Sequence, residues 1–178
     1  MKNILFTLAL LVCFNSFGQA SKPYIAVEIP DGADKYEKLN TYNKAIDNYP
    51  DRGYLYSGRG HIKWQLFNDL EAALVDYNMA VKLADGDKSI LNVLQQLGSI
   101  NRQLGNYYDA IYAYTRAIEA WDEYADCYVG RGDVKLIMGD LNGACKDWQK
   151  AIEVAEPDDK ASQMFSEVAQ NQIDKNCN

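Results

Sequence analysis

A pattern of small and aromatic residues recurs along this chain at a fixed period of thirty-four positions. The regular form of the pattern is a glycine, then an alanine, an aromatic residue and a second alanine, spaced by twelve, four and three positions. Two copies keep this spacing, namely Gly98, Ala110, Tyr114, Ala117 and Gly132, Ala144, Trp148, Ala151. A third copy has one extra residue in its connection, namely Gly60, Ala73, Tyr77, Ala80. Self-similarity at this period predicts an all-α solenoid of antiparallel helix pairs.

Short polar turns divide each predicted pair into two helices. The turns are Asn68-Asp69, Gly105-Asn106 and Gly139-Asp140, and these residue types end one helix and begin the next. We therefore expect a repeat domain over residues 35–178, with a half-repeat at its start. Within it, the sequence predicts helix pairs at about 53–83, 89–120 and 125–155, and a capping helix at about 158–174.

The first twenty residues have the three zones of a secretory signal peptide. Lys2 precedes an apolar run from Ile4 to Phe14, and small residues follow before Ala20. The run is short for a spanning helix, so we expect cleavage, export to the periplasm or the exterior, and no membrane span in the mature chain. A retained anchor is the alternative. Residues 21–34 contain two prolines and no helical periodicity, which indicates an extended leader.

The pattern resembles the tetratricopeptide repeat family, whose unit has a Leu-Gly-like pair followed by alanine, an aromatic residue and alanine. The sequence Leu97-Gly98 with Ala110, Tyr114 and Ala117 follows it closely. The resemblance implies a concave groove, lined mainly by the first helix of each pair, that binds a peptide or a protein surface. The connection from Leu83 to Ser89 is longer than is usual in the family, which predicts a changed stacking angle between the first and second pairs.

An arginine and an aspartate occur together in two copies and are both absent from the third. Arg59 occurs with Asp76, and Arg131 occurs with Asp147, whereas the middle copy has Leu97 at the arginine position. Folding each pair about its turn brings these positions together. We therefore predict an ion pair within the first and the third pair.

Three cysteines lie beyond the signal peptide: Cys127, Cys145 and Cys177. An exported protein meets an oxidising compartment. The folding argument separates Cys127 from Cys145, but it lets the tail carry Cys177 back towards Cys145. A Cys145–Cys177 disulfide is one alternative, and three free thiols are the other.

Composition and motifs argue against several function classes. A net charge of −7 disfavours nucleic acid, whose phosphates need clustered Lys and Arg. His61 is the only histidine, and there is no phosphate-binding loop or GxSxG turn. We therefore expect no cofactor, no metal and no catalysis.

The resemblance implies that the groove is lined by polar and apolar side chains from the first helix of each pair. These candidates are Tyr54, Ser57, His61, Trp64, Asn92, Gln95, Ser99, Arg102, Asp126, Val129, Asp133 and Leu136. The Lys and Asn side chains with which one subfamily grips chaperone carboxyl termini are missing from these positions. The sequence thus predicts a non-catalytic protein-interaction scaffold of the cell envelope, with an unidentified peptide or protein partner.

Two other functions stay open on the sequence alone. An enzyme or accessory subunit acting on cell-envelope polymer would use Asp126, Asp133 and His61 as its acidic and basic groups. A structural protein would use the repeats to associate with copies of itself, giving a homo-oligomer.

Overall fold

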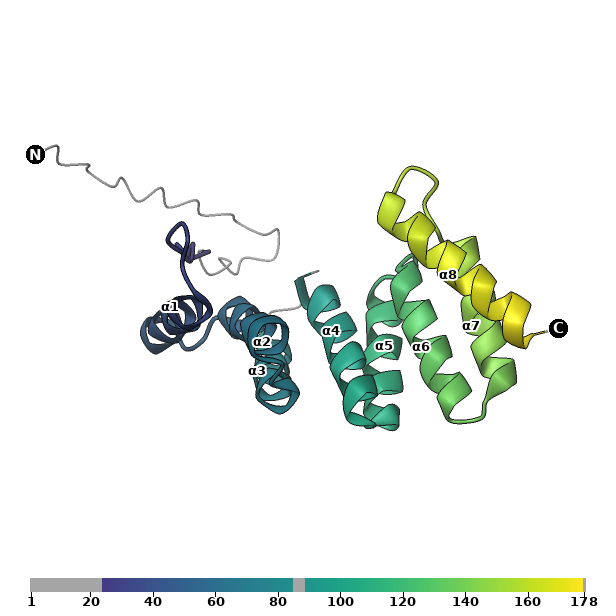
Figure 1. Cartoon of the computed structure of the whole chain (residues 1–178), viewed down its shortest axis with the longest axis horizontal. Helices are drawn as coiled ribbons and strands as arrows, with labels where there is room; N and C mark the ends of the chain where they lie inside the picture. Colours follow the sequence, from purple (N-terminus) through teal and green to yellow (C-terminus); the bar gives the residue numbers. More distant parts are fainter. Residues whose placement is uncertain (1–23, 85–88, 178) are drawn as a thin grey trace, which may run out of the picture.

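The computed structural model describes residues 24–84 and 89–177, which form helices joined by turns and no strand. The predicted signal peptide at 1–20 lies outside the described residues. The helices are α1 (Lys35–Asn48), α2 (Gly53–Phe67), α3 (Leu70–Lys82), α4 (Ser89–Leu104), α5 (Tyr107–Ala120), α6 (Ala125–Ile137), α7 (Leu141–Glu153) and α8 (Lys160–Asn176). The expected all-α solenoid of helix pairs is confirmed, and Figure 1 shows the helices following one another along the long axis.

Aspartate side chains fix where several helices begin. Asp34 caps α1 by accepting hydrogen bonds from the amides of Tyr36 and Glu37, and the Glu37 side chain accepts in return from the Asp34 amide. Asp69, Asp140 and Asp159 cap α3, α7 and α8 in a similar way. These carboxylates accept hydrogen bonds from amides that have no partner within the helix. Their negative charge also interacts favourably with the positive amino-terminal end of the helix dipole. The Asp159 cap explains why α8 starts two residues later than the sequence suggests.

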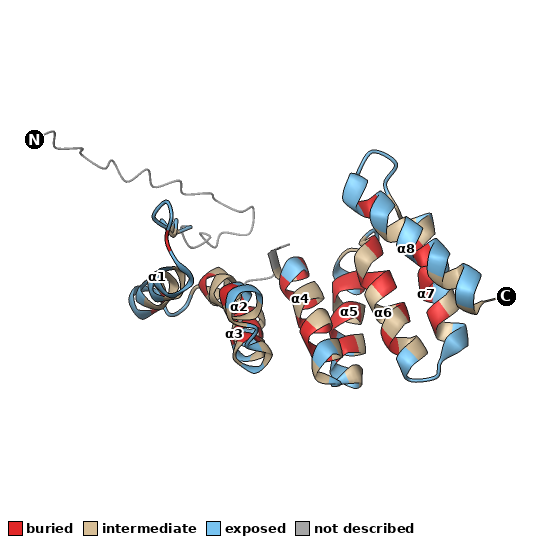
Figure 2. Cartoon of the chain, viewed as in Figure 1, coloured by how far each residue is buried: buried red, intermediate tan, exposed pale blue. Residues whose placement is uncertain are grey.

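The core runs through the helix pairs as one continuous apolar cluster. In each pair the second helix contributes an aromatic residue with flanking alanines, and Tyr77, Tyr114 and Trp148 are almost completely buried. Buried positions face the interior of the array and exposed positions face outwards in Figure 2. The repeated aromatic residues therefore have a packing role.

In the second and third pairs the repeat glycine lies against the aromatic ring of the second helix. A Cβ at Gly98 would lie 2.6 Å from the ring of Tyr114. A Cβ at Gly132 would lie 2.7 Å from Nε1 of Trp148 and 3.2 Å from the carbonyl oxygen of Ala144. Any larger residue at these glycines must displace a buried ring.

The direction of the helices changes between the first and second pairs. In Figure 1, α1, α2 and α3 are seen nearly along their axes, whereas α4 to α7 are seen from the side. Helices α3 and α4 still pack against each other. The changed stacking angle expected from the long connection is therefore present, although residues 85–88 of that connection lie outside the described part.

The two predicted ion pairs are confirmed. Arg59 donates through Nε and Nη2 to the two carboxylate oxygens of Asp76, at 2.9 and 2.7 Å. Arg131 binds Asp147 at the same two distances. Both aspartates are buried, with side-chain exposures of 2% and 6%. The bidentate geometry is the strong form of this interaction.

Each ion pair also has contacts that the sequence comparison missed. Lys63 and Lys135 approach the same aspartates, each at 2.8 Å. The remaining arginine nitrogen donates to the preceding helix, to Asn43 in one case and to Thr115 in the other. We call each set of Arg, Lys and Asp a polar clamp. Since the clamp reaches the preceding helix, it ties neighbouring repeats as well as the two helices of one pair.

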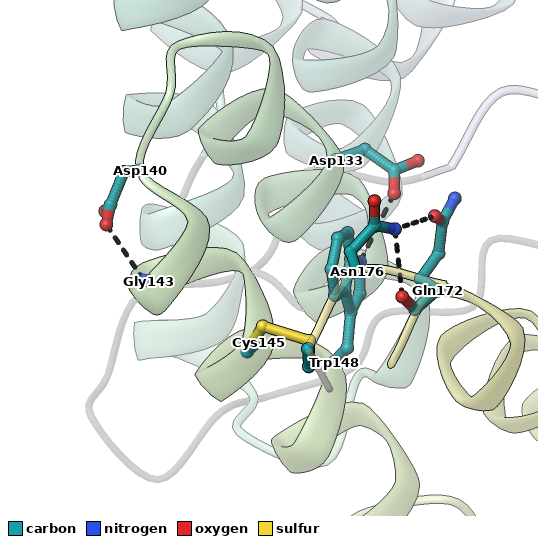
Figure 3. Close-up of a disulfide and its surroundings, with 8 residues drawn as sticks. Asp133, Asp140, Gly143, Cys145, Trp148, Gln172 and Asn176 are labelled. Atoms are coloured by element: carbon teal, nitrogen blue, oxygen red, sulfur yellow. Dashed lines mark hydrogen bonds between the residues drawn. A yellow bond between two sulfur atoms is a disulfide. The ribbon is translucent and has the colours of Figure 1, made fainter. Parts of the chain in front are cut away.

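A disulfide joins α7 to the end of α8. Cys145 and Cys177 are bonded, with their Cα atoms 6.0 Å apart, within the range that a disulfide spans without backbone movement. Figure 3 shows the bond crossing beside Trp148. Cys127 is a buried free thiol. The bond closes the carboxyl-terminal end of the array and fastens α8 to it.

Candidate functional site: the face of the first helices

A cavity of about 400 Å³ lies where the amino-terminal ends of α4, α6 and α8 approach one another. The cavity is open to solvent and lies on the face formed by α4 and α6, the first helices of the second and third pairs. Asn92 and Asp126 are the two predicted groove residues that line it. The α5–α6 connection contributes Trp121, Glu123 and Tyr124. The volume lies within the usual range for ligand sites.

Asp126 is the most unusual polar group of this cavity. Its Oδ1 is buried and has no hydrogen-bond partner among the described residues. Burial raises the pKa of Asp126 to about 6, against weaker opposing effects of Cys127 and the Gln95 side chain. A buried acceptor without a donor costs free energy, so this carboxylate is a destabilising group in the cavity wall.

The rest of the cavity wall is either acidic or apolar. Glu123, Glu156 and Asp159 add carboxylates, and Leu91 and Ala161 add apolar surface. Large rings come from Trp121, Tyr124 and Phe165. The cavity contains no Lys, Arg or His among its lining residues. The negative electrostatic potential of the cavity therefore favours cationic ligands.

The chain's own leader covers the groove position on α2. The ring of Tyr24 stacks on that of Tyr54, with centroids 4.7 Å apart. The Tyr54 hydroxyl accepts from the Ile25 amide at 2.7 Å and lies 3.2 Å from the Ile25 carbonyl, to which it can donate. Ser57 donates to the Tyr54 carbonyl. An extended segment therefore already occupies the beginning of the predicted groove.

A second hollow of about 390 Å³ lies beside the leader. His61 lines it, together with Ile29 of the leader and Tyr42 of α1. No carboxylate is among its lining residues. His61 is therefore on an accessible face, but it is not brought together with Asp126 or Asp133, which belong to α6.

Several predicted groove residues are paired with one another. Arg102 donates to Asp133 across α4 and α6 at 3.0 Å, and Asp133 also accepts from Trp148, as Figure 3 shows. Burial raises the pKa of Asp133, while Arg102 opposes the rise. These contacts hold α4 and α6 together. They leave Arg102 and Asp133 less available to a ligand than the sequence suggests.

Two further contacts use groove residues in a structural way. Tyr124 donates to Oδ1 of Asn92 at 2.6 Å. The Ser99 and Tyr114 hydroxyls lie 3.2 Å apart, and burial raises the pKa of Tyr114 to about 12. The Tyr124–Asn92 contact fixes one wall of the cavity.

Val129 does not line an accessible groove. It is only 5% exposed and belongs to the core. The helical projection placed it outwards, but α6 packs against α4 and α8 as well as α5 and α7, so less of its surface is free. Trp64 and Leu136 are also partly buried against the core. The open surface is thus narrower than predicted.

Sequence reasoning missed the aromatic and acidic residues outside the first helices. Trp121 and Tyr124 lie in or beside a connection, and Phe165 lies on α8. Glu123 and Glu156 look like ordinary solvated charges in the sequence. The signal in the sequence was Trp121 and Tyr124, two large aromatic residues three positions apart in a connection. Large aromatic side chains in a connection indicate that it packs against another element or binds a ligand.

The described residues set limits on other chemistry. Within 24–84 and 89–177, no group of three His, Cys, Asp or Glu side chains is arranged to hold a metal ion. In the same residues, no helix combines the length and the apolar character needed to cross a bilayer.

Comparison with known proteins gives one family match and many similar folds. Residues 91–120, which contain most of α4 and all of α5, match the model of the tetratricopeptide repeat. No curated protein sequence matches the chain significantly.

Among solved structures, similarity extends over most of the chain. YrrB, described as a TPR protein with an unusual peptide-binding site, is 21% identical with a TM-score of 0.64, over 77% of this chain and 66% of that one. PcrH from Pseudomonas aeruginosa is 17% identical with a TM-score of 0.63, over 71% and 92%. PcrH bound to the chaperone binding region of PopB is 18% identical with a TM-score of 0.61, over 67% and 93%. The chain therefore has the fold of tetratricopeptide-repeat proteins, and its α4–α5 pair carries the family's sequence pattern.

Proposed function

We propose that this chain is an exported, non-catalytic scaffold of the cell envelope that binds an extended peptide or protein segment along its first helices. The single observation that carries the proposal is the open cavity at the ends of α4, α6 and α8, which polar and aromatic side chains line. A hollow with a few converging polar groups is the usual form of a binding site.

Two further observations support binding of an extended segment. The leader lies on Tyr54 through backbone hydrogen bonds, so this face accepts extended chain. The similar protein YrrB is described as having a peptide-binding site, and PcrH has been solved with a bound region of PopB. Fold similarity alone does not settle function, and the cavity is what makes the proposal specific to this chain.

Export is supported by the signal-like first twenty residues and by the Cys145–Cys177 bond. Disulfides persist mainly in oxidising compartments. Fractionation of cells that express the full chain tests this part. Uncleaved protein in the cytoplasm, with its amino-terminal segment retained, would contradict it.

The alternative of an enzyme on envelope polymer finds less support. It needs His61 near Asp126 and Asp133, but His61 lines a separate hollow on α2, and Asp133 is paired with Arg102.

Selection from a random peptide library displayed on phage tests the binding proposal. The bait is the mature chain from Ser21, and the matched control is Ala161→Trp, which fills the cavity from an exposed position on α8. We expect peptides that are enriched on the parent chain and lost on the control. If no peptide is enriched, or if every enriched peptide binds both proteins equally, the proposal is wrong.

A further inference from the structure

We infer that the cavity at the ends of α4, α6 and α8 takes the basic side chain, lysine or arginine, of its peptide ligand. This inference rests on the proposed function and names the ligand class of the same site. Three properties of the cavity carry it: its charge, its carboxylate acceptors and its aromatic walls.

The charge of the cavity is one-sided. Its lining includes the four carboxylates Glu123, Asp126, Glu156 and Asp159, and no basic side chain. The amino-terminal ends of α4, α6 and α8 oppose this field, but each helix end is equivalent to only about half a positive charge. Even though Asp159 is partly used in capping α8, the carboxylates outweigh the three helix ends. An anionic ligand would therefore be repelled.

The carboxylates of the cavity wall are hydrogen-bond acceptors. Four of them are among its lining residues, and a charged N–H donor makes the strongest bond with a carboxylate. Lysine and arginine have donors and no acceptor. A glutamine side chain also donates, but it brings no charge to compensate the carboxylates, so it is expected to bind more weakly.

The aromatic walls suit the stem of a basic side chain. Trp121, Tyr124 and Phe165 line the cavity beside Leu91 and Ala161. Aromatic faces attract cations, and the methylene groups of lysine and arginine bury themselves against apolar surface while the charged end reaches polar partners. The combination of rings and carboxylates thus fits both parts of such a side chain.

The overall charge argues that the ligand comes from another protein. The chain has a net charge of −7, so two copies repel each other at long range. A basic segment of a partner protein is attracted by the same field. The inference therefore selects a basic peptide over a second copy as the occupant.

The selected peptides test this inference directly. We expect lysine or arginine to be enriched at one position, and replacement of that residue by glutamine to weaken binding about tenfold or more in fluorescence anisotropy. If the peptides depend on the cavity but show no basic enrichment, the inference fails while the proposed function stands. If no peptide is selected, the proposed function itself fails.

A model compound gives a second, independent readout. N-acetyl-arginine methylamide is titrated into the mature chain, and the indole signal of Trp121 is followed by NMR, with the glutamine analogue as control. We expect a saturable shift with the arginine compound that is lost in Glu123→Gln/Glu156→Gln. The charge-matched control is Asp109→Asn/Glu119→Gln, which removes two exposed carboxylates of α5 outside the cavity. Equal shifts with both compounds, or in both variants, would overturn the inference.

Discussion

Arg131 on α6 and Asp147 on α7 form a bidentate ion pair, with both hydrogen bonds shorter than 3 Å. The middle repeat has Leu97 and Ala113 at the corresponding positions, and both are buried. The same fold therefore closes one helix pair with charge and the next with apolar packing. This contrast within one chain lets the clamp be tested with a replacement that the protein already uses.

Removing one member of the clamp should destabilise the protein strongly. Asp147→Ala leaves Arg131 and Lys135 without their buried partner, and we expect a loss of about 2–4 kcal/mol in the free energy of unfolding, measured with urea. The triple variant Arg131→Leu/Lys135→Asn/Asp147→Ala copies the middle repeat, which has Asn101 at the lysine position. It should recover most of that loss. A triple variant as unstable as Asp147→Ala would show that apolar packing cannot replace the clamp here.

Loss of the disulfide should loosen α8. The bond closes a loop of 32 residues, so Cys145→Ser should cost about 3–4 kcal/mol by loop entropy, measured by thermal unfolding with and without reductant. Reductant should destabilise the parent chain and leave the variant unchanged. Thiol titration of the unfolded, unreduced protein from Ser21 should find Cys127 alone. Reaction of three thiols before reduction would show that the bond does not form.

Stability should depend on pH through Asp126. Its pKa is raised to about 6 in the folded chain, so the folded form holds the proton more tightly than the unfolded form. The free energy of unfolding therefore falls as pH rises from about 4 to about 6. Above that range, the destabilisation caused by burying the ionised carboxylate of Asp126 is fully present. Asp126→Asn removes this cost, and we expect a gain of up to about 3 kcal/mol at neutral pH, since one pKa unit corresponds to about 1.4 kcal/mol, with little change near pH 4.

Other charged groups near Asp126 set the background of this measurement. Glu123, Glu156 and Asp159 line the same cavity, and Asp109→Asn is the control because Asp109 is exposed on α5. Urea unfolding across the pH range checks the prediction. An Asp126→Asn curve parallel to that of the parent chain would contradict it.

The leader should be held on α2 by the Tyr54 hydroxyl. Tyr54→Phe keeps the ring that stacks on Tyr24 but removes both contacts with Ile25. We expect a small loss of stability, about 1 kcal/mol, together with faster amide hydrogen exchange at Ile25. Tyr56→Phe is the matched control, since its hydroxyl donates to Pro50 instead. Equal exchange at Ile25 in both variants would show that the hydroxyl does not hold the leader.

The fold was predictable because its information is local and repeated. The spacing from Gly132 to Trp148 recurs, so comparing copies identifies the packing residues and even the Arg131–Asp147 pair. The same comparison contained Lys63 and Lys135, each four positions after its arginine. These lysines are harder to recognise from the sequence because lysine is common on exposed helix surfaces, where it needs no buried partner.

The candidate site was harder to predict because it depends on contacts between distant segments. Phe165 and Trp121 line the same cavity only because α8 packs against α6. Val129 becomes buried for a similar reason, since helical periodicity gives the direction of a side chain but not what covers it. The leader on Tyr54 joins residues 29 positions apart, and no pattern in either segment indicates this contact.

Helix pairs closed by a polar clamp alternate with a pair closed by apolar packing, and this alternation affects how a chain of similar repeats folds with the correct helix pairing. Similar helices could pair with the wrong neighbour during folding, because each one offers the same alanines and rings. If α6 paired with α5 in the way that α4 does, Arg131 and Lys135 would face Ala113, and Asp147 would be left without a counterion. The polar clamps thus make pairing between a polar and an apolar repeat costly, and they keep the middle pair distinct from the two pairs that flank it.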